Sequence, residues 1–189
     1  MKKFFLFFFT ALLLTSQMVS CIDDDPENEQ ELITKVTFTL TPDVSGTPVV
    51  LQFVDSDGDG GNPPVITTSG PLKNSTLYHG EILVSNEAAM PPVDITTEIK
   101  EESDDHQFFF IPSGDLDGKI SFQYADIDNN GNPVGLLTDV HTHQTSSGGK
   151  LKIVLRHEPN KTASGVNQGN IANAGGETDI EIEFNVNIE

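Results

Sequence analysis

The chain has 189 residues, with 29 acidic side chains against 10 lysines and arginines and a formal net charge of −19. This balance excludes nucleic acid and anionic lipid headgroups as direct partners of the folded part, because both carry dense negative charge. The length fits one domain with its own hydrophobic core, and a single cysteine excludes an internal disulfide bond.

Residues 1–20 have the pattern of a secretory signal peptide. Two lysines at positions 2 and 3 precede an apolar run, residues 4–14, that is too short to span a bilayer comfortably. The tetrapeptide MVSC at residues 18–21 resembles the lipobox of bacterial lipoproteins, with methionine where leucine is usual. A lipid on Cys21 would hold the protein at a membrane and would explain the lone thiol. The alternative is an ordinary cleaved signal with an incidental cysteine.

Residues 21–31 are expected to be a lipidated cysteine followed by an acidic tether. Without the two lysines of the signal peptide the chain carries 29 acidic against 8 basic side chains, a net charge of −21. A run of like charge cannot pack, so this segment should be solvated. Acids directly after the cysteine also resemble the surface-export signal of Bacteroidota lipoproteins; the alternative is a plain spacer. The acids are Asp23, Asp24, Asp25, Glu27, Glu29 and Glu31.

Residues 32–189 are expected to form one domain of β structure. Apolar and polar residues alternate at 36–40, 78–84, 151–155 and 180–188, and two further strands are expected at 108–111 and 120–125. In the last strand, Ile180 to Ile188 should face the core, whereas Asp179, Glu181 and the following polar residues should face water. One helix is expected at 94–103, with Asp94 as its cap. Clusters of Gly, Pro, Asn and Asp between short strands predict an all-β, antiparallel immunoglobulin-like β-sandwich of about seven to nine strands.

An internal echo is the most informative feature of this domain. The sequence LQFVDSDGDGGNP at 51–63 matches FQYADIDNNGNP at 122–133. Each copy is the end of a strand followed by the pattern D-x-D-x-[DN]-G. Two copies about seventy residues apart predict a duplicated hairpin, or two equivalent loops at the same end of a sandwich.

Both loops carry oxygen side chains at alternate positions, as in the first half of an EF-hand, and are candidates for Ca²⁺. The closing glutamate of an EF-hand is replaced by Ile66 and Leu137, so other ligands would have to complete the shell. The alternative is that Asp and Asn form side-chain turns that tighten hairpins. The candidate ligands are Asp55, Asp57, Asp59, Asp126, Asp128 and Asn130.

The histidines suggest a second, less favoured metal, Zn²⁺. Asp139, His141 and His143 alternate, so on a strand all three would face one side and offer two imidazoles and a carboxylate. The following residues, 145–149, are typical of a loop. His106 and His157 lie beside charged residues and are expected to be isolated surface histidines. The pattern contains no nucleophile–base constellation and no phosphate-binding glycine loop, which predicts a protein that is not an enzyme and has no organic cofactor.

Several segments together resemble a family of small Bacteroidota lipoproteins. They are the lipobox with its acidic tail, residues 29–34 and 53–66, EESDDHQFFF at 101–110, and RHEP at 156–159 with residues 175–184. The family is labelled "type 1 periplasmic binding fold", and some members lie beside TonB-dependent outer-membrane receptors. The resemblance spans nearly all of the chain after Cys21 and implies an accessory binding role. The label implies a two-lobed α/β fold with long amphipathic helices, which this sequence lacks, so the β-sandwich remains the expected fold.

Two hypotheses about function follow. The first is an outer-membrane, cell-surface lipoprotein that captures a ligand or metal ion for a TonB-dependent uptake system. The second is a structural or adhesive surface module whose acidic loops hold Ca²⁺ for rigidity. The long segment 159–176, rich in Asn, Gly, Ala and Ser, would be a contact surface or a mobile connection.

Overall fold

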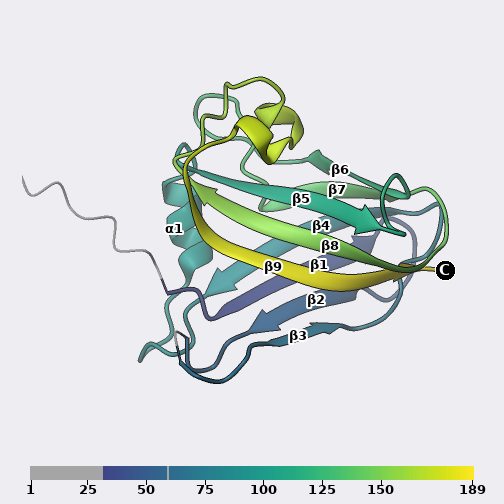
Figure 1. Cartoon of the computed structure of the whole chain (residues 1–189), viewed down its shortest axis with the longest axis horizontal. Helices are drawn as coiled ribbons and strands as arrows, with labels where there is room; N and C mark the ends of the chain where they lie inside the picture. Colours follow the sequence, from purple (N-terminus) through teal and green to yellow (C-terminus); the bar gives the residue numbers. More distant parts are fainter. Residues whose placement is uncertain (1–31, 59) are drawn as a thin grey trace, which may run out of the picture.

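The computed structural model describes residues 32–58 and 60–189, so the predicted signal peptide, Cys21, the acidic tether and Asp59 lie outside the described residues. Two antiparallel sheets are packed face to face (Figure 1). The larger sheet has the strand order β3-β2-β1-β4-β7-β6, and the smaller sheet has the order β5-β8-β9. The strands of the larger sheet are β1 (Lys35–Pro42), β2 (Val49–Val54), β3 (Val65–Thr68), β4 (Leu77–Ser85), β6 (Ile120–Tyr124) and β7 (Leu137–Thr142). Those of the smaller sheet are β5 (His106–Gly114), β8 (Ser146–His157) and β9 (Glu177–Ile188).

The prediction of an all-β antiparallel sandwich with seven to nine strands is confirmed, since the described residues form nine strands. The expected helix is also present as α1 (Ile95–Glu101). The Asp94 side chain caps it by accepting a hydrogen bond from the Thr96 backbone N–H at 3.0 Å. The hydroxyl of Thr96 in turn exchanges hydrogen bonds with the backbone of Val84, which fixes the helix to β4. No helix within residues 32–58 and 60–189 is long and apolar enough to cross a membrane.

The core lies between the two sheets and follows the alternation of the strands. Phe38, Ile82, Phe108, Ile153 and Phe184 are fully buried there. Burying a side chain of this size stabilises the fold by about 1.5 to 3 kcal/mol, so these positions determine which face of each strand points inward. The register of β1 against β4, with Phe38 opposite Ile82, places two of them directly side by side.

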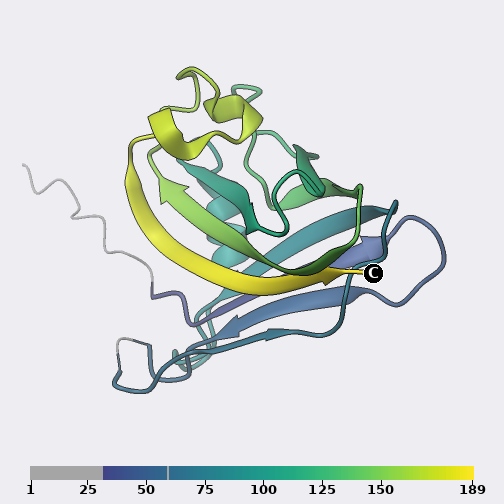
Figure 2. The ribbon, with the colours of Figure 1, turned by 45° about the vertical axis from the view of Figure 1, so that its right-hand side comes forward.

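A second, smaller cluster lies on the other face of the β5-β8-β9 sheet. Phe109 and Val154 project from the sheet and are covered by Val166 and Ala174 from the segment 159–176. That segment contains two short 3-10 helices, η1 (Val166–Gln168) and η2 (Ile171–Asn173), and stands at one end of the sheet in Figure 2. The long connection is therefore a packed cap on the sheet.

Two expectations about β8 and β9 were wrong. Ser146 to Gly149 begin β8 rather than forming a loop; Gly149 is there because a Cβ would collide with Leu116. Asp179 does not face water with its neighbours on β9, since its side chain is only 10 % exposed.

The internal echo corresponds to two hairpins of the larger sheet. One loop joins β2 to β3 and the other joins β6 to β7, at opposite edges of that sheet. Neighbouring strands in the sheet order β2-β1-β4-β7-β6 are antiparallel, so β2, β4 and β6 run in the same direction. Both loops therefore lie at the same end of the sandwich, where β4 also leads into α1 (Figure 1).

Candidate functional site

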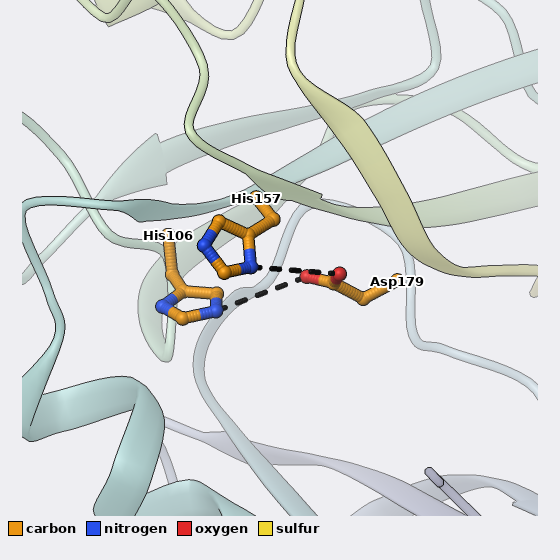
Figure 3. A group of neighbouring side chains, drawn as sticks. All are labelled: His106, His157 and Asp179. Carbon is orange, nitrogen blue, oxygen red and sulfur yellow. Dashed lines mark ion pairs between the residues drawn. The ribbon is translucent and has the colours of Figure 1, made fainter. Parts of the chain in front are cut away.

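Three side chains converge at this same end of the sandwich: His106, His157 and Asp179 (Figure 3). One ligand atom from each lies within 4.8 Å of the others. His106 Nε2 is 3.8 Å from Asp179 Oδ2, and His157 Nδ1 is 3.9 Å from Asp179 Oδ1. The two imidazole rings lie side by side with centroids 4.7 Å apart. Within the described residues this is the single group with such spacing of metal-binding side chains.

The strand register explains how these distant residues meet. His106 and His157 are direct partners at the first residue of β5 and the last residue of β8. Residues two positions apart on a strand point to the same face. His106 is two residues from Phe108 and His157 is two residues from Leu155, both in the core, so both imidazoles lie on the core side of the sheet. The strand register thus places residues that are far apart in the sequence next to each other at one end of the smaller sheet.

A β-bulge brings in the carboxylate. Leu155 pairs with Ile180 and Arg156 pairs with Thr178, so Asp179 is the additional residue in β9. A bulge interrupts the alternation of a strand and redirects a side chain. Asp179 therefore turns away from the water-facing row of β9 and toward the two histidines (Figure 3).

The hydrogen bonds of His106 determine which of its nitrogens is available. Nδ1 lies 3.0 Å from the carbonyl oxygen of Glu102. A carbonyl oxygen only accepts, so Nδ1 carries a proton, and the neutral form of the ring has its lone pair on Nε2. This lone pair faces Asp179 Oδ2, which is also an acceptor. Metal-binding histidines are commonly oriented by such a bond from their other ring nitrogen to a carbonyl group.

Asp179 is a nearly buried carboxylate with one oxygen that has no hydrogen-bond partner. Its Oδ2 is buried and has no hydrogen-bond partner. Burial raises the pKa of Asp179 above its ordinary value and the charge of Glu177 raises it further, whereas a positive charge on His106 or His157 would lower it. A buried acceptor of this kind is costly unless a cation neutralises it. The cluster therefore has the electrostatic character of an incomplete cation site.

The donor set selects a class of metal. Two imidazole nitrogens and one carboxylate suit Zn²⁺ and neighbouring transition metals, whereas Ca²⁺ prefers oxygen ligands. In a tetrahedral zinc site, ligands at about 2.0 to 2.1 Å from the metal are about 3.4 Å apart. The two nitrogen–oxygen distances of 3.8 and 3.9 Å would thus have to shorten by about 0.5 Å. These two distances run to different oxygens of Asp179, and the ligand atoms of the group lie within 4.8 Å of one another, so a bound ion would have to draw the three side chains together.

The structure does not gather the zinc ligands predicted on β7. Asp139 accepts a hydrogen bond from His79 Nδ1 at 2.8 Å. His143 lies beyond the strand, where its Nε2 is 2.8 Å from the Ser121 hydroxyl. The rings of His141 and His143 are parallel at 6.5 Å. Asp139 and His143 are therefore bonded to other side chains, and the three predicted ligands do not form a group with metal-ligand spacing among the described residues.

The first acidic loop is only partly described, because Asp59 lies outside the described residues. Asp57 accepts hydrogen bonds from the backbone and side chain of Asn62, and these lower its pKa. This is the side-chain turn that was the alternative to a calcium site. Asp55 differs, since its Oδ1 is buried without a hydrogen-bond partner.

The second acidic loop already has a cation of its own. Lys161 Nζ lies 3.0 Å from Asp128 Oδ2, with the side chains 4 % and 0 % exposed. Asp128 also accepts from the backbone N–H groups of Asn130 and Asn132. Burial alone would raise the pKa of Asp128, but these hydrogen bonds and Lys161 together lower it. Asp126 accepts from two further backbone N–H groups, those of residues 135 and 137.

Comparisons with protein-family models, with curated proteins and with solved structures found no match for this chain. The interpretation of the site therefore depends on the residues themselves. Sequence reasoning treated His106 and His157 as isolated surface histidines, but His106 is buried and the His157 side chain is 17 % exposed. One local signal could have indicated their burial. Each histidine lies two residues from a core position of an apolar strand segment, FFFI for His106 and KIVL for His157.

Proposed function

We propose that this protein is a lipid-anchored outer-membrane module that binds a divalent transition-metal ion, with Zn²⁺ as the first candidate, and does not catalyse a reaction. The carboxylate of Asp179 carries the proposal: it is buried, one of its oxygens has no hydrogen-bond partner, and two imidazoles converge on it. A bound divalent ion would neutralise this carboxylate and use both ring nitrogens. The sequence favoured Ca²⁺, and the imidazole donors reverse that preference.

The anchor and the partner are further parts of the proposal, and they are supported by the sequence. The lipobox ending at Cys21 and the acids after it favour attachment to the outer membrane with the domain at the cell surface. A metal-binding module held there would serve a TonB-dependent receptor that imports the ion. Replacement of Cys21 by serine should release the protein from the membrane fraction, and protease added to intact cells should cleave the wild-type domain.

The metal proposal is tested by titrating the full chain, purified in detergent, with Zn²⁺ in a calorimeter. We expect one ion per chain, and we expect His157→Ala to abolish binding. His141→Ala is the matched control, since it removes an imidazole from the alternative cluster on β7. Loss of binding in His141→Ala with retention in His157→Ala would move the site to β7. No binding by the wild-type chain would refute the proposal.

The variant Asp179→Asn provides a second test, because it should affect thermal stability differently without and with Zn²⁺. Without metal, the variant should be at least as stable as the wild type, because a neutral amide is cheaper to bury than an uncompensated carboxylate. With Zn²⁺, the variant should gain no stability, whereas the wild type should. Thermal melts with and without the ion measure both effects. A structural role for the carboxylate predicts the reverse in the metal-free melt.

A structural module stabilised by Ca²⁺ is the second candidate, and Asp55 favours it. Its buried Oδ1 has no hydrogen-bond partner and lies two residues from the carboxylate of Asp57. If this candidate is right, Ca²⁺ will raise the melting temperature of the wild type and not that of Asp55→Asn. The same melts performed with Ca²⁺ in place of Zn²⁺ separate the two candidates.

A further inference from the structure

Glu177 stands beside the cluster of His106, His157 and Asp179. The register pairs His106 with His157 and His157 with Glu177, so these three residues form a row across the ends of β5, β8 and β9. Residues directly opposite each other in antiparallel strands project to the same face, with Cβ atoms about 4.5 to 5.5 Å apart. Glu177 is thus a next neighbour of the His157 imidazole on the face where the cluster lies.

Glu177 is the exposed carboxylate of this row, at the start of β9. Glu181 and Glu183 of the same strand form ion pairs with Lys152 and Lys150.

The position of Glu177 matters because the number of protein ligands decides whether a zinc site is open or closed. A zinc site with three protein ligands keeps its fourth position open for water or substrate, whereas a site with four protein ligands is closed. His106, His157 and Asp179 provide three donors from the protein interior. Glu177, opposite His157 at the start of β9, is the exposed carboxylate next to these three donors in the strand register.

We propose that Glu177 is the fourth ligand of the metal ion held by His106, His157 and Asp179, and that it closes the site from the solvent side. This inference rests on the proposed function. The three interior donors are buried or nearly so, which makes Glu177 the one ligand that an incoming chelator or a receptor can displace first. The site would then hold a Zn²⁺-class ion in a closed shell that opens at one exposed carboxylate.

The test uses the full chain in detergent and the variants Glu177→Gln and Glu183→Gln. The second variant is the matched control, because it removes the same charge from the same strand six residues away. Affinity for Zn²⁺ is measured by competition with a chromophoric chelator. Co²⁺ is then bound as a spectroscopic probe, whose visible bands are strong in a four-coordinate tetrahedral site and weak in a six-coordinate one. Thermal melts verify that each variant is folded.

We expect Glu177→Gln to weaken Zn²⁺ binding at least about tenfold, a loss that disturbance of even an outer partner of a metal site can produce, and to weaken the Co²⁺ bands. Glu183→Gln should change neither. Equal affinities of Glu177→Gln and the wild type would overturn the inference, leaving water as the fourth ligand and the proposed function intact. Equal losses in both variants would also overturn it, since the effect would then be one of general charge. A wild-type chain that binds no metal would overturn the proposed function itself.

Discussion

Removal of Lys161 should be among the most destabilising single changes available in this protein. Its ammonium group is buried between Asp128 Oδ2 and the carbonyl oxygen of Ser103, at 3.0 and 2.5 Å. In Lys161→Met a flexible apolar chain of similar length replaces it, and Asp128 keeps a buried charge without its cation. Breaking a buried ion pair by removing one partner costs about 3 to 5 kcal/mol. Asp128 retains hydrogen bonds from Asn130 and Asn132, which places the expected cost near 3 kcal/mol.

A chain of this length loses about 2 to 4 °C in Tm for each kcal/mol, so Lys161→Met should melt roughly 6 to 12 °C below the wild type. The assay is urea unfolding monitored by circular dichroism, together with a thermal melt. The double variant Lys161→Met/Asp128→Asn completes a cycle. It should recover part of the loss, because the buried charge is then gone. A cost below about 1 kcal/mol for Lys161→Met, as for an exposed pair, would refute the reasoning that this pair is buried and holds the 159–176 segment in place.

Three other changes have expected outcomes. Gly80→Ala should destabilise the fold by about 1 to 3 kcal/mol through overpacking. The added Cβ would lie 2.5 Å from Thr138 Oγ1 and 2.6 Å from Phe38 Cε2. The midpoint of urea unfolding measures this loss, and an unchanged midpoint would contradict the tight contact. The hydrogen bond to Asp139, and after it the one to Asp43, raise the pKa of the His79 imidazole above 6.5. The protonated ring should therefore contribute fully to the stability of the fold below pH 6.5. This contribution should be lost as the pH rises through the pKa of His79 in the folded protein. NMR titration of the His79 ring checks this, and Asp139→Asn should lower the midpoint. Finally, Zn²⁺ at about one hundred times its dissociation constant should stabilise the protein by about 2.7 kcal/mol, and Asp179→Asn should abolish that gain in a thermal melt.

The parts of the fold that local pattern determines could be predicted. The alternation from Ile182 to Ile188 specifies a half-buried strand, and the Asp94 cap specifies the start of α1. Strand β3 was missed because three of its four residues are exposed and show no alternation. The echo of the two acidic loops predicted a duplicated hairpin or two equivalent loops at one end of the sandwich; the structure has two hairpins whose loops lie at one end, since each follows a strand running in the same direction.

The site could not be predicted, because its geometry is not local. His106 and His157 meet through the register of β5 and β8, and no spacing in the sequence reports a register between strands fifty residues apart. Asp179 was assigned to the water-facing side because alternation alone puts it there. The bulge that redirects it depends on how β9 fits against β8. The partner of Asp128, Lys161, comes from the segment 159–176, for which the sequence left open a contact surface or a mobile connection.

The position of the cluster relative to the anchor has a geometric consequence. Lys35 pairs with Ser85, so β1 begins at the same end where β4 leads into α1 and where His106, His157 and Asp179 meet. If Cys21 carries a lipid, the chain between it and the domain enters at this end. Eleven residues, 21–31, extend at most about 40 Å. The metal-binding end would then be confined to a layer above the membrane in which an outer-membrane receptor exposes its surface. Lengthening the tether should therefore leave Zn²⁺ affinity unchanged and reduce any transfer of the ion to that receptor.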